Sequence, residues 1–247
     1  MRYLILSDIH ANLTALDAVL EAAKGHWQKA VCLGDVVGYG PDPNEVVDRV
    51  RSLEALTIRG NHDKAGSGIA NAEDFNPVAR AVALWTREQL RPENREYLEK
   101  LPIGPVSVDG FSIVHGAFRD EDEYVFAPAQ ALDSLLDAPS PVTFFGHTHL
   151  QGGFKLHDDK VGVLHFKPAG EDHFSALTIE EGTTYLLNPG SIGQPRDGDT
   201  RAAFAIADLD HKSVEFWRVA YDIEKVQERM TKAGLPEALV LRLALGR

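Results

Sequence analysis

The stretch YLILSDIH, residues 3–10, joins a short apolar run to two residues that can bind a metal. Four consecutive apolar residues without polar alternation predict a strand that is covered on both faces of its sheet. Asp8 and His10 lie two residues apart beyond this run, and in extended chain that spacing places both side chains on one side. The stretch therefore predicts a buried strand whose carboxyl end offers two ligands to one metal ion.

Four further apolar runs end in the same way. The carboxyl ends of parallel strands meet at one edge of a sheet, so polar residues that follow different strands are expected to converge in one crevice. Together the five ends hold seven candidate ligands, which predicts a dinuclear metal site. The four runs are residues 30–33 before Asp35, residues 56–58 before Asn61, residues 111–114 before His115, and residues 142–145 before His147 and His149.

The donor types narrow the choice of metal. Carboxylate, amide and imidazole ligands without a thiolate suit manganese, iron, zinc or nickel better than a soft metal or an iron–sulfur cluster. We expect two divalent transition metal ions, with manganese as the first choice. Taken alone, each residue has an ordinary interpretation as a hydrogen-bonded core histidine or a helix-capping aspartate, but five matches in one chain favour the metal site.

The composition argues against a membrane span and against export. No stretch approaches the roughly 20 apolar residues of a membrane-spanning helix, and the N-terminus enters a strand directly instead of showing a signal-type segment. The single cysteine, Cys32, cannot form an intrachain disulfide and lies within a predicted core strand. A single cysteine that forms no intrachain disulfide fits a reducing compartment. We therefore expect a cytoplasmic protein without a membrane partner.

The charge balance argues against a long nucleic acid as partner. The net charge is −12, from 37 acidic and 25 basic residues among 247. Binding to a phosphate backbone needs a basic stripe, and no run of lysine or arginine supplies one. The predicted partner is a small molecule, and the oligomeric state stays open.

Alternating strands and helices in the first part of the chain predict a largely parallel sheet. A helix is expected over residues 13–23, where apolar residues recur at helical spacing before Gly25. A second helix is expected to begin at Pro43, with Asp42 as its N-cap.

Residues 64–105 are predicted to be mostly helical and to lie near the site. Pro77 and Pro92 are expected to open two helices there. The segment AGSG, residues 65–68, is predicted to be a short flexible loop that can lie over the crevice.

Closely spaced strands are predicted from about residue 152 to residue 219, with turns at residues 158–159 and 210–211, and they suggest a second, mainly antiparallel sheet. Residues 222–247 are predicted to form a helical tail. We therefore predict a single α/β domain over residues 1–247, a four-layer α/β/β/α sandwich in which two packed mixed sheets are flanked by helices.

The polar blocks resemble the signature of the calcineurin-like metallophosphoesterases and occur in the order of that family. The resemblance extends from residue 1 to about residue 210. The segment NPGS, residues 188–191, resembles an extra block of the small phosphodiesterase-type members of bacteria and archaea. The signature blocks are DIH at 8–10, GD at 34–35, GNHD at 60–63, the single His115, and GHTH at 146–149.

The resemblance implies how the seven ligands divide between two metals, with Asp35 shared. A carboxylate suits the shared position, because a two-oxygen anion can span two cations and offset their repulsion. One metal is expected to bind Asp8, His10, Asp35 and His149, and the other to bind Asp35, Asn61, His115 and His147.

The resemblance also implies the reaction, which is hydrolysis of a phosphate ester by in-line attack of a hydroxide that bridges the two metals. It places His62 above the phosphate, where this residue protonates the leaving alkoxide or stabilises the developing charge. Asp63 is expected to orient the His62 ring, and the alternative is a carboxylate that stabilises the turn.

Asn61, Tyr39 and Arg196 are candidate substrate-binding residues. Tyr39 lies in a GYGP loop that resembles one bordering the site, and it can stack on or hydrogen-bond a substrate group; the alternative is an ordinary turn before a helix. Arg196 can bind a second phosphate through its planar guanidinium. The alternative is a surface ion pair with Asp197 or Asp199.

We predict an enzyme, a metallophosphoesterase that hydrolyses a small phosphate ester, and we favour a phosphodiester. A dinucleoside polyphosphate hydrolase and a protein phosphatase with the same site are alternatives. A non-catalytic scaffold such as the retromer subunit of this fold is disfavoured, because every ligand position is intact. A nuclease is disfavoured because the chain has neither the extra length nor the basic surface of the superfamily's nucleases.

Overall fold

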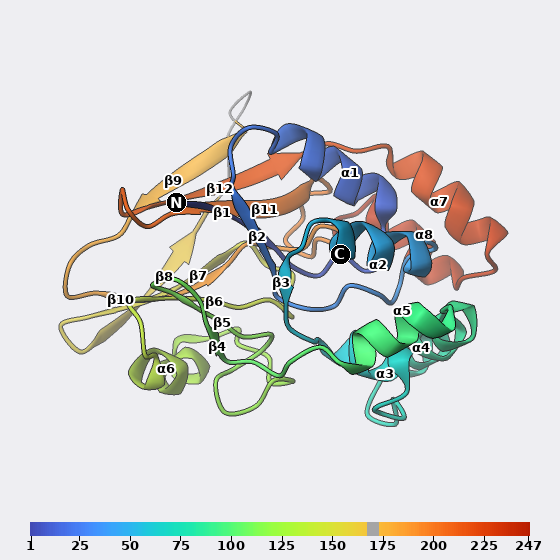
Figure 1. The fold of residues 1–247 in the computed structure, drawn as a ribbon, viewed down its shortest axis with the longest axis horizontal. Coiled ribbons are helices and arrows are strands. Elements are labelled where there is room, and N and C mark those ends of the chain that lie inside the picture. The colour runs from blue at the N-terminus through green and yellow to red at the C-terminus, as the bar shows by residue number, and fades with distance from the viewer. Residues whose placement is uncertain (167–172) are drawn as a thin grey trace.

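The computed structural model describes residues 1–166 and 173–247 of the chain. Its strands form two six-stranded sheets packed face to face, and helices cover the outer faces (Figure 1). Both sheets are mixed, since each contains parallel and antiparallel pairs. The predicted four-layer α/β/β/α sandwich is confirmed.

The first sheet is built around β1 (Arg2–Leu6), the strand with which the chain begins. β1 pairs parallel with β2, and β2 pairs parallel with β3. On its other side β1 pairs antiparallel with β11, which continues to β12 and β9. The order is β3 (Leu56–Thr57), β2 (Lys29–Cys32), β1, β11 (Ala202–Asp208), β12 (Ser213–Val219) and β9 (Phe174–Thr178).

The second sheet has a parallel centre, in which β6 pairs with β5 and with β10. The remaining pairs are antiparallel: β4 with β5, β7 with β8, and β7 with β10. The order is β4 (Val106–Ser107), β5 (Ser112–Ile113), β6 (Val142–Phe144), β10 (Thr184–Asn188), β7 (Gly152–His157) and β8 (Lys160–His165).

The prediction that the strands beyond residue 152 form a sheet of their own is wrong. β9, β11 and β12 extend the first sheet, whereas β7, β8 and β10 extend the second. The physical reason is backbone hydrogen bonding, because the buried parallel strands β1 and β6 would otherwise leave unpaired N–H and C=O groups on one side. The later strands satisfy those groups.

The side chains of β1 alternate between two cores. Tyr3 and Ile5 lie in the core between the sheets, together with Phe144 of the second sheet. Leu4 and Leu6 lie in the core beneath the helices. The four-residue apolar run is therefore buried on both faces, as the sequence predicts.

α1 (Leu13–Ala22) and α2 (Pro43–Ser52) pack on the first sheet, and Asp42 is the N-cap residue of α2 as predicted. α6 (Pro128–Asp137) covers the second sheet through Ala131 and Leu135. This helix has no counterpart in the sequence prediction. Within the described residues, no helix is both long enough and apolar enough to cross a membrane.

Three helices occupy the predicted helical segment: α3 (Asn61–Ser67), α4 (Pro77–Gln89) and α5 (Pro92–Glu99). The predicted flexible loop at residues 65–68 is wrong, because residues 65–67 form the last turn of α3, which ends at Gly68. Gly66 is buried, and a Cβ there would lie 3.1 Å from Val37. The glycine at this position therefore allows close packing and does not indicate a flexible loop.

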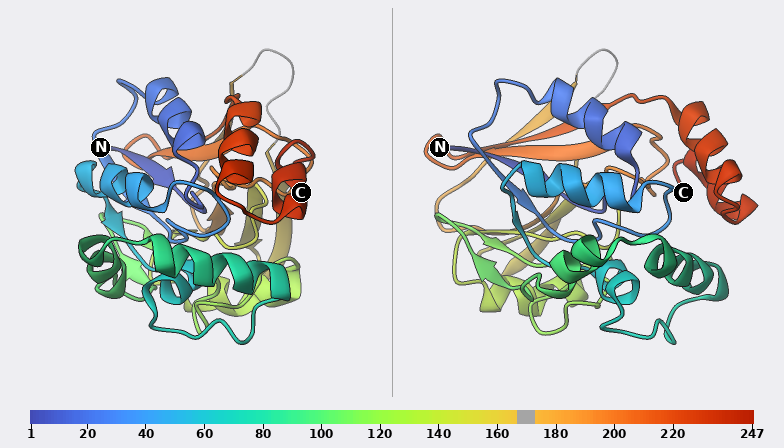
Figure 2. Two further views of the ribbon diagram at one scale, coloured as in Figure 1. Left: turned by 90° about the vertical axis from the view of Figure 1, so that its right-hand side faces the viewer. Right: turned by 45° about the vertical axis from the view of Figure 1, so that its right-hand side comes forward.

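The chain ends in α7 (Ile223–Lys232) and α8 (Glu237–Leu243). Figure 2 shows these helices (red) on the same side of the molecule as helices α3 to α5 (cyan to green). Met230 and Leu239 pack against Val82 of α4 and against Tyr39 in one apolar cluster. The C-terminal helices therefore reach a loop that borders the strand ends.

Candidate metal centre

The carboxyl ends of five strands converge as predicted. Asp8 and His10 follow β1, Asp35 follows β2, and Asn61 begins α3 just after β3. His115 follows β5, and His147 and His149 follow β6. The structure brings six of these seven residues into two groups whose ligand atoms lie within 4.8 Å of one another: Asp8, His10, Asp35 and His149, and Asp35, His115 and His147.

The first group presents two imidazoles and two carboxylates to a common point. Nε2 of His10 lies 3.0 Å from Nε2 of His149. Asp35 Oδ2 is 3.6 Å from His10 Nε2, and Asp8 Oδ1 is 3.4 Å from His149 Nε2. All four side chains are buried, so the geometry suits a shared cation.

Backbone carbonyls orient both rings of this group. The Nδ1 of His10 is 3.1 Å from the Val37 carbonyl oxygen, and the Nδ1 of His149 is 2.6 Å from that of Gln194. When Nδ1–H donates to such a carbonyl, the Nε2 lone pair is left for a metal, which is the usual arrangement of ligating histidines.

The second group is organised in the same manner. His115 Nδ1 lies 2.8 Å from the Leu33 carbonyl oxygen, and its Nε2 lies 3.3 Å from Asn61 Oδ1. His147 uses the opposite nitrogen, since its Nε2 lies 3.0 Å from the Asp122 carbonyl oxygen. The Asn61 amide oxygen thus stands beside the second group as a further oxygen donor.

Asp35 belongs to both groups. Its Oδ2 lies 3.6 Å from Nε2 of His10 and also 3.6 Å from Nε2 of His115. Its Oδ1 accepts a hydrogen bond of 2.8 Å from the backbone N–H of His62. One oxygen of this carboxylate therefore lies equally close to an imidazole of each group.

Five of the seven predicted ligands adopt left-handed backbone conformations. Residues other than glycine rarely do so, and the strain persists only where the surrounding structure imposes it, most often at functional sites. The φ values are 50° at Asp8, 49° at His10, 53° at Asp35, 65° at His147 and 61° at His149.

Two glycines permit the close approach of these loops. A Cβ on Gly34 would lie 2.5 Å from the backbone nitrogen of Gly60, and a Cβ on Gly60 would lie 2.2 Å from Asp35 Oδ1. A larger residue at position 60 would therefore clash with the Asp35 carboxylate, and one at position 34 would clash with the backbone of residues 59–60.

Burial and mutual charge shift the acid–base properties of the centre. Burial raises the pKa of Asp8 to about 6. Burial also acts to raise the pKa of Asp35, but the nearby imidazoles, His115 first, hold it well below its usual range. Burial opposes protonation of His115, yet the charges of Asp35 and Asp8 raise its pKa to about 10. These anions favour a positive charge at the centre.

His62 lies against the first group, with its ring packed among aromatic side chains. Ring centroids are 4.3 Å apart for Tyr39 and 4.8 Å apart for Phe75. Burial lowers the pKa of His62 to about 4. Within the described residues its Nδ1 is buried without a hydrogen-bond partner.

Asp63 makes contacts different from those predicted for an orienting residue. Its carboxylate accepts hydrogen bonds from the backbone N–H groups of Gly60 at 2.9 Å and Val37 at 3.1 Å. Both oxygens therefore stabilise the start of α3 and its neighbouring loop. This pattern corresponds to the alternative interpretation, a turn-stabilising carboxylate.

A cavity of about 330 Å³ opens beside the two groups. Asn61, His62 and His147 line it on the side of the centre, and Tyr39, Phe75 and Tyr124 form aromatic walls. It has the size and polarity to take the organic part of a small ligand.

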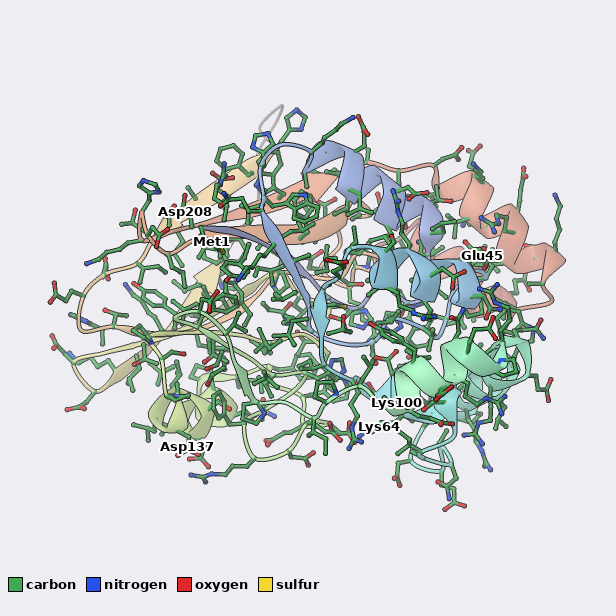
Figure 3. The ribbon with its side chains drawn as sticks, in the orientation of Figure 1. Met1, Glu45, Lys64, Lys100, Asp137 and Asp208 are labelled. Atoms are coloured by element: carbon green, nitrogen blue, oxygen red, sulfur yellow. The ribbon has the colours of Figure 1, made fainter. Side chains whose placement is uncertain are left out.

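Tyr124 is a site residue that the sequence did not single out. Its ring stacks on that of His147 with centroids 3.8 Å apart. The loop that carries it is anchored by Lys64 of α3, labelled in Figure 3, which pairs with Glu121 at 2.9 Å and Asp122 at 2.5 Å. An isolated tyrosine in a loop gives no sequence signal of this contact.

Arg196 is turned toward the centre. Its guanidinium carbon lies 5.7 Å from the Tyr39 ring centroid, and Nη2 donates to Gln194 Oε1 at 3.0 Å. The alternative prediction of an ion pair with Asp197 or Asp199 is wrong. These two aspartates pair instead with Arg218 and Arg201 respectively.

Residues 1–212 match the model of the calcineurin-like phosphoesterase superfamily domain. The chain belongs to this superfamily. It is a metallophosphoesterase, a class of phosphoester hydrolase that uses divalent metal ions, and the two ligand groups are its candidate metal site.

Relatives of this metallophosphoesterase extend over almost the whole chain. An uncharacterized protein of Methanocaldococcus jannaschii is 35% identical, covering 98% of this chain and 97% of its own. The phosphodiesterase YfcE of Escherichia coli is 26% identical, covering 87% and 91%. A crystal structure of a metallophosphoesterase from Sphaerobacter thermophilus is 41% identical, with a TM-score of 0.84 over 100% and 99% of the two chains.

Proposed function

We propose that this metallophosphoesterase is a phosphodiesterase that hydrolyses a small phosphate ester with the help of two divalent metal ions. Manganese is the metal that we favour. The observation that carries the proposal is the shared position of Asp35 between two ligand groups below an aromatic-walled cavity. The similarity to YfcE, a phosphodiesterase by name, supports it. The expected substrate is a solute of the cytoplasm.

In this proposal the ligands divide between two ions in the way that the family resemblance implies. Asp8, His10 and His149 would hold one ion, and Asn61, His115 and His147 would hold the other, with Asp35 common to both. Such ions supply Lewis acidity toward phosphoryl oxygens and an activated water nucleophile. The protein fixes the ligands through the carbonyls of Val37, Gln194, Leu33 and Asp122.

His62 acts on the leaving group in this proposal. With a pKa lowered to about 4 by burial, the imidazole is neutral at pH 7 and serves first as an N–H hydrogen-bond donor. The approach of an anionic phosphoryl group favours its protonated form, because opposite charges stabilise each other at short distance. His62 can thus stabilise the developing alkoxide and deliver a proton to it.

The charges around the cavity favour a phosphodiester over a phosphomonoester. Asp74 and Asp122 line the cavity, and Lys64, the cation on its wall, is already paired with Glu121 and Asp122. A monoester dianion would meet more repulsion here than a diester monoanion. The organic group of a diester can contact Phe75 and the neighbouring tyrosines.

A substrate panel tests the proposal. The metal-free protein is assayed with bis(p-nitrophenyl) phosphate and with p-nitrophenyl phosphate, before and after addition of manganese, iron, zinc or nickel. We expect metal-dependent hydrolysis with a higher kcat/KM for the diester, and none in Asp35→Asn. Metal binding without hydrolysis of any ester would instead favour the scaffold alternative.

A further inference from the structure

A buried ion pair lies behind the first ligand group and includes a residue beyond the family match. Arg218, near the end of β12, is 2% exposed and pairs through Nη2 with Asp197. Burying two charges costs free energy, which their attraction repays only where further hydrogen bonds complete the pair. Such a pair contributes little net stability by itself, so its contacts indicate its role.

The guanidinium of Arg218 joins two loops. Its Nε donates to Gln151 Oε1 at 3.0 Å, and Asp197 Oδ2 also accepts a hydrogen bond of 3.3 Å from the backbone N–H of Gln151. The Gln151 amide in turn donates to the carbonyls of Pro189 and Trp217, both at 3.1 Å. Residues 151 and 197 are thus tied to each other and to β12.

The two residues that Arg218 joins flank a metal ligand and the carbonyl that orients it. One lies two positions after His149, and the other lies three positions after Gln194. His149 Nδ1 is 2.6 Å from the Gln194 carbonyl oxygen, and the backbone N–H of Arg196 donates to the His149 carbonyl at 3.2 Å. Arg218 therefore connects, from behind, the two loops that meet at His149.

The second ligand group is oriented from other parts of the fold. The ring of His115 contacts the Leu33 carbonyl, and that of His147 contacts the Asp122 carbonyl. Among the described residues, the side chain of Arg218 makes no hydrogen bond to either of these carbonyls. Its influence should therefore reach one group of ligands and spare the other.

We propose that Arg218 is a positioning residue for the first ligand group. Through Asp197 and Gln151 it holds the two loops in register. The Gln194 carbonyl then fixes the His149 ring with Nε2 turned toward the other ligands of the group. The inference rests on the two-ion centre of the proposed function. Loss of a residue that orients a metal ligand commonly weakens the metal 10- to 100-fold, and because Arg218 acts at one further remove we expect about tenfold.

Two single-ion backgrounds test the proposal. His115→Ala leaves the first ligand group complete, and His10→Ala leaves the second complete. Manganese binding to chelator-treated protein is measured by titration calorimetry in each background, with and without Arg218→Gln. We expect the substitution to weaken manganese about tenfold in the His115→Ala background and to leave its affinity unchanged in the His10→Ala background. An equal loss in both, or no loss in the first, would overturn the proposal.

Val214→Ala is the matched control for a general loss of stability. Val214 lies on the same strand and is fully buried in the core between the sheets. Its truncation should lower Tm but leave manganese affinity in the His115→Ala background unchanged, and an equal weakening there would assign the effect of Arg218→Gln to stability alone. If Arg218→Gln does not fold, Asp197→Asn removes the same ion pair and decides: a selective loss supports the proposal, and unchanged affinity overturns it.

The orientation of the His149 ring can also be followed without any metal. Proton–nitrogen NMR of the chelator-treated parent should show the Nδ1–H of His149 protected by the Gln194 carbonyl, and its assignment follows from its absence in His149→Gln. In Arg218→Gln we expect this signal to be lost through exchange with water, whereas an unchanged signal would overturn the proposal. A parent that binds no manganese would refute the proposed function by itself, and the NMR comparison would then still decide the role of Arg218.

Discussion

The Nε2 atoms of His10 and His149 lie 3.0 Å apart, although the two residues follow strands of different sheets. The same holds in the second group, where Asp35 follows a strand of the first sheet and His115 a strand of the second. Each ion of the proposed pair would therefore be held from both sheets at once. Bound ions would therefore link the two sheets at the edge of the sandwich where the strands end.

Metal removal is therefore expected to destabilise the fold as well as to abolish activity. A ligand at 100 times its dissociation constant stabilises the folded state by about 2.7 kcal/mol. For a chain of this size one bound ion should then raise Tm by roughly 5–10 °C. Differential scanning calorimetry of chelator-treated protein with and without manganese measures this shift, and a Tm that does not respond to manganese would contradict it.

Asp35→Asn should weaken both ions, because its carboxylate contributes to both groups. The amide keeps the shape but removes the charge that offsets repulsion between two cations. We expect no measurable turnover and fewer than one ion per chain by elemental analysis. Asp8→Asn is the comparison, since Asp8 belongs to one group alone and should spare the second ion. Full activity of the parent with a single tightly bound ion would refute the dinuclear centre.

The ligands were predictable because each follows a short apolar strand and belongs to a residue type that binds metals. Asp35 and His115 lie 80 positions apart in the sequence, and the strand pattern predicts that each follows the end of a buried strand. The two strands belong to different sheets, so it is the packing of the sheets that brings the residues together. The left-handed conformations at Asp8 and His147 could not be read from the sequence. These backbone conformations are imposed by the way in which the loops pack around the centre.

Features that depend on packing between segments far apart in the chain could not be predicted from the sequence. The pairing of β1 with β11 joins segments at opposite ends of the chain, and no local pattern specifies such a partner. Tyr124 stacks on His147 from a loop whose residue Glu121 pairs with Lys64 of α3, and no local pattern in the sequence indicates these contacts. Gly66 resembles a flexible turn residue but is a packing residue inside α3.

His62→Ala should keep both metals yet lower the rate about 10²- to 10⁴-fold for an ester with an alkoxide leaving group, the usual range for general acid catalysis. The loss should be much smaller for p-nitrophenolate, which departs without a proton. The measurement is kcat for methyl p-nitrophenyl phosphate against a dialkyl phosphate, with metal content determined for each preparation. Equal losses for both leaving groups would assign His62 to phosphate positioning instead.

Gly38→Ala tests the position of His62 without changing any polar side chain. A Cβ at residue 38 would lie 2.4 Å from His62 Nδ1, and the backbone there has a φ of 92°, which disfavours alanine. The clash should turn the imidazole away from the cavity while the ligand groups remain. We therefore expect the leaving-group dependence of His62→Ala together with an unchanged metal content.

Gly25→Ala is the matched control for that variant, because its φ of 79° carries similar backbone strain but a Cβ there meets no atom within 4 Å. Any loss of stability due to alanine in the left-handed region should appear in both variants, whereas the loss of rate should appear only at residue 38. If Gly38→Ala hydrolyses dialkyl and nitrophenyl esters at the parent rates, the ring of His62 does not need its observed position, and its role at the leaving group is excluded.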